Sequence, residues 1–185
     1  MGFLGVFLLV VLILLIFIYN GLVAKKNKVE ESESDIDVML KKRFDLIPNL
    51  VETVKAYMSH ERETLVELTE LRSQAQSGGL STSEQNEIAS KVSRMGRGLM
   101  VQVENYPDLK ASNNFLQLQA SWNEVEEQLS ASRRGFNAAV NSYNNGLEQF
   151  PSNLMAQMMN YVTKDYIDVP EEEKGNTSAK ELFNN

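Results

Sequence analysis

Few residues in this sequence are of the types that carry out chemistry. The 185 residues include no cysteine and one histidine, His60. A chain without thiols cannot form disulfides, thiol nucleophiles or thiolate metal sites. His60 and Glu61, with Glu63 nearby, could contribute to a metal site, but a di-iron helical bundle needs two Glu-x-x-His motifs. We therefore interpret these three residues as part of a solvated helix face.

Two further patterns could carry chemistry, and neither is specific. Serine, histidine and aspartate all occur, but no nucleophile elbow presents a serine for triad catalysis. Gly96-Arg97-Gly98 is an isolated Gly-x-Gly that follows no predicted strand, so it does not indicate a phosphate site. The sequence thus predicts no catalytic residues, no cofactor and no metal, and we expect the protein not to be an enzyme.

The charged residues all lie beyond the first 24 positions. All 18 Lys and Arg and all 25 Asp and Glu follow Ala24, so the net charge of −7 belongs to the remainder. That remainder has about the length of one domain. Its acidic balance argues against a nucleic-acid partner, because proteins that bind nucleic acid present a basic face.

The leading segment has the length and composition of a membrane span. Residues 1–19, MGFLGVFLLVVLILLIFIY, contain no charged or amide side chain, and a helix of about 20 apolar residues crosses the hydrocarbon core. A cleaved signal peptide would instead need a basic leading region, a shorter apolar stretch and a small-residue cleavage site. Because the sequence has none of these, we favour a single-pass anchor in the cell (inner) membrane, with the lipid bilayer as a partner.

The lysines next to the span predict its orientation. Lys25, Lys26 and Lys28 follow the span directly, and no Lys or Arg precedes it. Basic residues beside a span favour the cytoplasmic side of the membrane. We therefore expect the N-terminus outside and the bulk of the chain in the cytoplasm.

Beyond the span, apolar residues recur every three and four positions, which predicts helices. One stripe runs without interruption from Ile36 to Leu71 and ends in a Gly- and Ser-rich loop at 73–83. A second helix is expected to begin near Ser81, a residue suited to capping, and to end at Pro107. Gly96 and Gly98 in this helix are small enough to allow a neighbouring helix to approach closely.

The third predicted helix carries the clearest pattern. Large residues recur every seven positions from Phe115 to Phe150, and a second set follows three positions after each. Two positions per heptad on one face are typical of helices that pack at a shallow angle, as in coiled coils. We interpret the aromatic residues as bundle core rather than as a ligand site. A short helix around 154–159 and an extended segment at 161–169 are expected next.

These elements predict an all-α fold, in which an N-terminal transmembrane helix is followed by an antiparallel bundle of long helices. We expect a transmembrane anchor at 1–24 and a helical juxtamembrane stalk at 25–45 that is continuous with the bundle. The bundle is expected at 46–160, and a partly extended, acidic tail at 161–185.

Pro48 lies within the first stripe, although a proline inside a helix costs about 3 kcal/mol. In one interpretation a single long helix is kinked at Pro48, and the Phe44 carbonyl is left free. In the other, Asp45 caps a new helix that has Pro48 in its first turn. The unbroken apolar register favours the first interpretation, with Asn49 helping to satisfy freed backbone groups. In both, Pro48 joins the stalk to the bundle.

A basic cluster at 41–43 lies close to this proline. On a straight helix it would stand roughly 25–30 Å from the interface, too far for direct contact with lipid. We therefore expect the cluster to pair within the chain, with Asp45 as a nearby partner.

Two groups of side chains near the end of the third helix could bind a partner. Asparagines spaced at four and three positions share one face, and they either face solvent or hydrogen-bond another backbone. Methionines follow in the short helix, and methionine adapts to irregular partner surfaces. The candidate interaction strip is Asn137, Asn141, Asn144, Met155, Met158 and Met159.

Several stretches together resemble the LemA family of bacterial membrane-anchored proteins. They are YNGLV (19–23), KRFDLIPNLVETVKAYMSHE (42–61), VENYPDLKASNNFLQLQ (103–119) and SRRGFNAAVNSYNNGLEQFPSNLMA (132–156). The resemblance extends from about Tyr19 to Met159. It implies one N-terminal transmembrane helix followed by an antiparallel helical bundle, with no established enzymatic activity and no known cofactor. The chain departs from the family pattern at Trp122, Asn123 and Phe136.

Two hypotheses for function follow from the sequence. The first is a membrane-anchored interaction or scaffold protein, whose bundle binds a protein partner or a second copy of itself to form a homo-oligomer. The second is a ligand- or cofactor-binding bundle, or an enzyme, with a pocket between helices. The strong heptads and the shortage of His and Cys favour the first.

Overall fold

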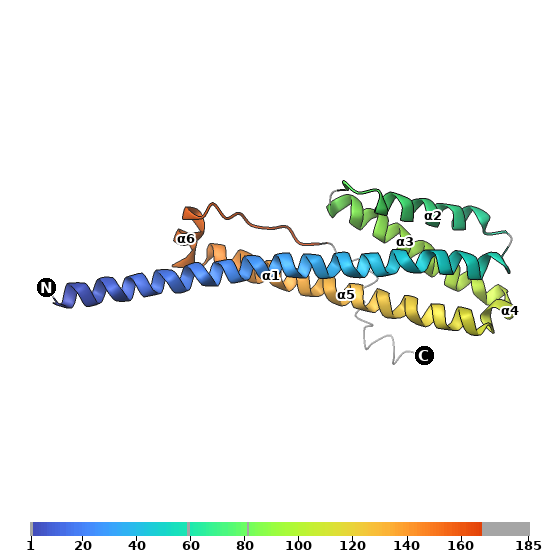
Figure 1. Cartoon of the computed structure of the whole chain (residues 1–185), viewed down its shortest axis with the longest axis horizontal. Helices are drawn as coiled ribbons and strands as arrows, with labels where there is room; N and C mark the ends of the chain where they lie inside the picture. Colours follow the sequence, from blue (N-terminus) through green and yellow to red (C-terminus); the bar gives the residue numbers. More distant parts are fainter. Residues whose placement is uncertain (1, 59, 81, 168–185) are drawn as a thin grey trace, which may run out of the picture. The chain divides into compact units, whose positions relative to one another are not determined.

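The computed structural model describes residues 2–58, 60–80 and 82–167, and over these residues it contains helices and no strand (Figure 1). The expected all-α fold with a long apolar N-terminal helix is confirmed. The elements are α1 (Gly2–Lys55), α2 (Arg62–Gln76), α3 (Thr82–Gln102), the 3₁₀ turn η1 (Val103–Asn105), α4 (Pro107–Lys110), α5 (Asn113–Glu148) and α6 (Ser152–Met158).

The described residues pack as two compact units, and α1 and α5 contribute to both. One unit contains residues 2–36 and 131–167, and the other contains residues 37–130. The boundaries expected for anchor, stalk, bundle and tail stay a prediction, because they divide the chain by sequence character rather than by packing.

In the first unit, α1 and α5 pack side by side in opposite directions. Leu22 lies beside Gly146, where a Cβ atom would stand 3.4 Å from Leu22 Cδ2. One turn further along α1, Lys25 Nζ donates hydrogen bonds to the carbonyl and the hydroxyl of Ser142, at 3.0 and 2.8 Å. Gly146 therefore allows a close approach of the two helices at this point.

The first part of α1 extends beyond these contacts and has the character of a membrane span. Its most apolar 18-residue window has a mean hydropathy of 3.1 and is not buried against any other described residue. Its exposed side chains are Phe, Leu, Ile and Val, a composition that water does not favour but a hydrocarbon core does.

In the second unit, the end of α1 packs with α2, α3 and the first half of α5. Buried Leu50, Leu68 and Leu99 come from three of these helices. Trp122 of α5 is also buried, and it lies over Gly96 of α3, where a Cβ atom would stand 2.2 Å from Trp122 Cζ2. The expected close approach thus occurs at Gly96, whereas Gly98 has open space around it.

The first helix does not continue to Leu71, and that expectation is wrong. α1 ends at Lys55, the chain turns between residues 56 and 61, and α2 runs back until Arg72 lies beside Phe44. The reversal contains no glycine or proline, and the apolar spacing is kept on both sides of it. Periodicity therefore could not reveal it. The role of Pro48 as the joint between stalk and bundle stays a prediction.

The third predicted helix is confirmed as α5, with one correction at its end. Its heptad residues from Phe115 to Tyr143 are buried, apart from half-buried Ser132. Phe150 is exposed, because α5 ends at Glu148 and the chain turns there. The short helix is present as α6, and residues 161–167 have no helix or strand. The proposed cap Ser81 and the end of the tail lie outside the described residues.

Candidate functional site

Pro48 lies inside a continuous helix, so no new helix begins at Asp45, and the kink expected at Pro48 stays a prediction. The Phe44 carbonyl, which would accept from an N–H at position 48, is not left free as we expected. Arg72 Nε donates a hydrogen bond to it at 3.1 Å. A side chain of α2 thus replaces the donor that proline lacks. Asn49 is exposed.

Arg43 is fully buried in the second unit, where it links three helices. Its Nη1 donates to Glu126 Oε1 at 2.7 Å and also to the Ser93 hydroxyl, and its Nη2 donates to the Ala89 carbonyl at 3.0 Å. Arg43 therefore pairs with Glu126 of α5 rather than with Asp45. The signal was present in the sequence, since Arg43 occupies a heptad position between apolar residues of the first stripe.

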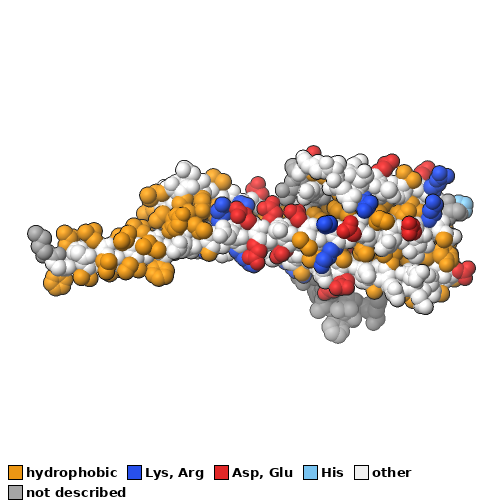
Figure 2. All heavy atoms as spheres, viewed as in Figure 1, with side chains coloured by type: hydrophobic (Ala, Val, Ile, Leu, Met, Phe, Trp, Pro, Cys, Tyr) orange, Lys and Arg blue, Asp and Glu red, His pale blue; other side chains and the backbone are white. Residues whose placement is uncertain are grey.

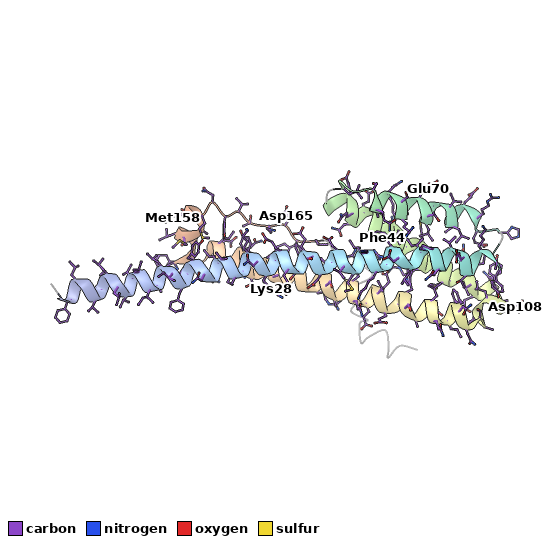
Figure 3. All side chains as sticks on the ribbon, in the orientation of Figure 1. Lys28, Phe44, Glu70, Asp108, Met158 and Asp165 are labelled. Atoms are coloured by element: carbon purple, nitrogen blue, oxygen red, sulfur yellow. The ribbon has the colours of Figure 1, made fainter. Side chains whose placement is uncertain are left out.

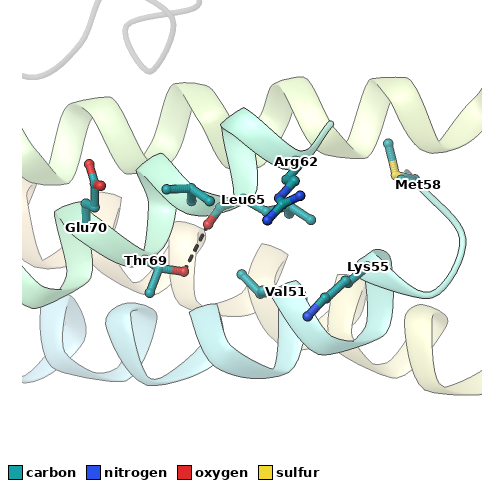
Figure 4. Close-up of a pocket in the computed structure, with 8 residues that line it drawn as sticks. Val51, Lys55, Met58, Arg62, Leu65, Thr69 and Glu70 are labelled. Atoms are coloured by element: carbon teal, nitrogen blue, oxygen red, sulfur yellow. Dashed lines mark hydrogen bonds between the residues drawn. The ribbon is translucent and has the colours of Figure 1, made fainter. Parts of the chain in front are cut away.

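A groove of about 610 Å³ lies between α1 and α2 in the second unit (Figure 4). Its walls are mainly apolar, and it is open to solvent rather than enclosed. Thr69 is turned toward its own helix, because its hydroxyl donates to the Leu65 carbonyl at 2.9 Å. The lining residues are Val51, Lys55, Met58, Arg62, Leu65, Val66, Thr69 and Glu70.

The charges of the groove are separated along its length. Lys55 and Arg62 flank the chain reversal at one end, and Glu70 lies about two turns further along α2 (Figures 3 and 4). The apolar side chains lie between these charges. The sequence alone does not reveal the groove, because the groove forms only when α2 folds back on α1.

The asparagine strip binds the backbone of the extended segment 161–167. Asn137 Nδ2 donates to the Ile167 carbonyl and its Oδ1 accepts from the Ile167 N–H, both at 2.9 Å. Asn144 makes the same pair of bonds with Lys164, also at 2.9 Å. The Tyr166 hydroxyl lies 3.4 Å from Asn141 Oδ1. Two of the three asparagines therefore hold a segment of this chain, and their binding of a partner stays a prediction.

Side chains of the extended segment add further contacts in the first unit. The Tyr161 ring lies 6.1 Å from the Tyr143 ring, centroid to centroid, and Lys26 Nζ lies 6.0 Å from the Tyr161 centroid. The pKa of the Tyr143 phenol is raised, mainly by burial and to a lesser extent by the neighbouring Tyr161. Lys164 pairs loosely with Glu33 at 3.9 Å. These contacts fix the segment beside α1 and α5.

The methionines of α6 differ in exposure. Met155 and Met159 are half-buried, whereas Met158 is exposed (Figure 3). The interaction proposed for them is not tested by this arrangement. The topology residues Lys25, Lys26 and Lys28 all lie on α1, just beyond its apolar part.

His60 and Glu61 lie in the chain reversal rather than on a helix face, so that interpretation is wrong for these two residues, whereas Glu63 is exposed on α2. Glu61 accepts hydrogen bonds from the Tyr106 hydroxyl at 3.1 and 3.2 Å. Burial, reinforced by this carboxylate, raises the pKa of the Tyr106 phenol. Within the described part of the chain, no three His, Cys, Asp or Glu residues gather as a metal site would require.

Comparisons with known proteins place these features in a family. The model of the LemA family matches residues 32–180. Protein LemA of Metamycoplasma hominis is 27% identical over 165 residues, which cover 89% of this chain and 75% of that protein.

Magnetosome proteins are also similar to this chain. Magnetosome protein MamQ 2 of Paramagnetospirillum magneticum is 23% identical, and Magnetosome protein MamQ of Magnetospirillum gryphiswaldense is 20% identical. Both matches cover 80% of this chain but only 64% of the magnetosome protein. Since the family model matches well over half of the residues, this membrane-associated helical chain belongs to the LemA family.

Proposed function

We propose that this protein is a membrane-anchored interaction module, in which the groove between α1 and α2 binds a helical segment of a protein partner. The apolar, open groove is the observation that carries the proposal. The proposal assigns no catalytic step to the chain, and the absence of enzyme activity and of a cofactor stays a prediction.

The shape of the groove suits a helix as its occupant. A helix can lay an apolar face into a hydrophobic groove and anchor it with side chains three and four positions apart. The groove is open to solvent along two packed helices, so a segment from another protein can reach it. Val66, with half of its surface exposed, offers apolar contact area at this site.

The charges of the groove indicate the chemistry of that helix. Lys55 and Arg62 at one end would attract acidic side chains, and Glu70 would favour a basic residue two turns away. Charge complementarity of this kind sets the direction and register of a bound partner. We therefore expect an amphipathic helix with acidic residues at one end.

A small amphiphilic ligand is the second candidate occupant. The volume of about 610 Å³ lies within the roughly 300–1,000 Å³ of known ligand sites. Such a ligand would place an anionic group at Lys55 and Arg62. It would travel with the purified protein in stoichiometric amount, and native mass spectrometry would detect it.

Site-specific photocross-linking in intact membranes tests the proposal. A benzoylphenylalanine replaces Val66 in the groove or, as a control, Val101 of α3, which is exposed to a similar or greater degree. We expect a discrete protein adduct at position 66 and none at position 101. The cross-linked peptide should carry Asp or Glu on the side facing Lys55. A second copy of this chain in the adduct would support self-association, and equal yields at both positions would contradict the proposal.

The orientation in the membrane is also a proposal. Lys25, Lys26 and Lys28 favour a cytoplasmic location for everything beyond the span. A reporter that works only in the cytoplasm should therefore be active when it is fused after Asn185. Activity of a reporter that works only outside the cell membrane would overturn this orientation.

A further inference from the structure

Four large apolar side chains on and around α6 are exposed to solvent. They recur every four residues, so those on the helix point to a similar side. We call them the corner patch, because they lie where the chain turns out of α5. Their exposed fractions are 80% for Phe150, 55% for Leu154, 79% for Met158 and 75% for Val162.

The corner patch lies near the level at which the apolar span of α1 ends, at Tyr19. Gly146 of α5 is beside Leu22 of α1, and Leu22 is three residues, or about 4.5 Å, beyond Tyr19. α5 runs opposite to α1, so its end at Glu148 is about 3 Å nearer to the span than Gly146. Phe150 follows directly.

The far end of the corner patch is held at almost the same level. Tyr161 lies 6.0 Å from Lys26 Nζ and 6.1 Å from the Tyr143 ring. The chain is therefore held against α1 on both sides of α6, at Gly146 before the helix and at Tyr161 after it, and both contacts lie within a few residues of Leu22. α6 cannot move far along α1 without breaking these contacts.

The composition around the corner patch fits a lipid interface. No charged residue occurs from Gln149 to Thr163, although the chain beyond the span is otherwise acidic. Figure 2 shows hydrophobic side chains along the first part of α1 and again over α6, with Lys, Arg, Asp and Glu gathered beyond them. An apolar face of this kind can enter the headgroup region by about 5–10 Å.

We propose that the corner patch rests in the headgroup layer of the membrane that α1 crosses, as a second contact with the bilayer. The headgroup regions add roughly 5–7 Å to each side of the hydrocarbon core. This thickness exceeds the short axial distance between Tyr19 and the end of α5. The contact would remove four exposed apolar side chains from water and would hold the α5–α6 corner at a fixed depth. It does not depend on the groove in the other unit.

Depth-dependent fluorescence quenching tests this proposal on the full chain. The protein contains no native cysteine, so Met158→Cys carries a single environment-sensitive dye. Val101→Cys is the control, because it is equally apolar and 70% exposed but belongs to the other unit. Each protein is placed as one copy per nanodisc, in phosphatidylethanolamine and phosphatidylglycerol with or without lipid-borne spin labels.

We expect the lipid-borne spin labels to quench the dye at position 158 severalfold more than the dye at position 101. Iodide in water should quench position 158 less than position 101. Equal iodide quenching at both positions would overturn the proposal. A dye at position 158 that neither quencher reaches would also overturn it, in favour of a protein surface covering the corner patch.

A second variant protects the test from a local effect of the dye. Leu154→Asp combined with Phe150→Asp places charges on exposed positions, so the helical circular dichroism should be unchanged. In this background the lipid-borne quenching at position 158 should fall to the level of the control. Quenching that persists undiminished would contradict a role of the corner patch in membrane contact.

Discussion

The buried arginine of the second unit illustrates how single residues specify this bundle. Arg43 meets a carboxylate from α5 and a hydroxyl and a carbonyl from α3. A buried ion pair is weak evidence for stability, since desolvation offsets much of the attraction. Its geometry nevertheless permits one register of the three helices, because a slip by one residue would leave the guanidinium without these partners.

Removal of the carboxylate from this network should be costly. In Glu126→Ala the guanidinium stays buried without its counter-charge, and such changes cost about 3–5 kcal/mol. Urea unfolding of the full chain in detergent measures the loss. The double variant Arg43→Met, Glu126→Met should recover most of it, because no charge is then buried. A double variant no more stable than Glu126→Ala would contradict this role.

Two glycines of α3 offer a matched pair of substitutions. Gly96→Ala places a methyl group against the Trp122 ring, and overpacking of this kind costs about 1–3 kcal/mol. Gly98→Ala meets no atom within 4 Å and should stabilise the helix by up to about 1 kcal/mol. Thermal unfolding of the two variants should shift in opposite directions. Equal shifts would show that the contact with Trp122 does not make an added methyl group at position 96 destabilising.

At the scale of elements, Pro48 is tolerated because a neighbouring helix compensates for it. The Phe44 carbonyl receives its hydrogen bond from Arg72 instead of from an N–H in its own helix. This explains how α1 stays continuous through the proline. It also ties the end of α2 to α1 at the point where the two helices lie beside each other.

A double-mutant cycle measures this compensation. Arg72→Met should cost about 1–2 kcal/mol in the natural background, since a hydrogen bond from a charged donor is lost. In the Pro48→Ala background the new N–H at position 48 can bond the Phe44 carbonyl, so the same change should cost clearly less. Chemical unfolding of the four proteins provides the coupling free energy. An identical cost in both backgrounds would refute the compensation.

Helix positions could be predicted from the sequence, but the turns between them only in part. The heptads of α5 define its buried face, because apolar spacing reports directly on which side faces the core. The reversal at 56–61 could not be found, since the apolar register is unbroken across it and no glycine or proline marks it. The groove depends on this reversal, and it was missed for the same reason.

Polar contacts divide in a similar way. Arg43 stands at a heptad position, so a buried charge there could have been predicted. Its partner Glu126 could not, because the pairing depends on how two distant helices align. The asparagine spacing left open whether the strip faces solvent or hydrogen-bonds a backbone, and Asn137 and Asn144 do the latter. The sequence did not reveal that this backbone is residues 164–167 of the same chain.

At the scale of the whole molecule, the chain combines a span with two different apolar surfaces. The span and the corner patch belong to the first unit, and the groove belongs to the second. We interpret the first two as membrane contacts and the groove as the site for a partner. Membership in the LemA family agrees with membrane association and leaves the partner open.

The measurement that tests the interaction module most directly is the photocross-linking yield at position 66 after charge reversal of the groove. Lys55→Glu combined with Arg62→Glu should lower the yield about tenfold, the effect of roughly 1.4 kcal/mol lost from binding. Lys41→Glu combined with Lys42→Glu, an equal change of net charge on exposed positions elsewhere in α1, should leave the yield unchanged. Equal yields from the two double variants would contradict the assignment of the groove as the partner site.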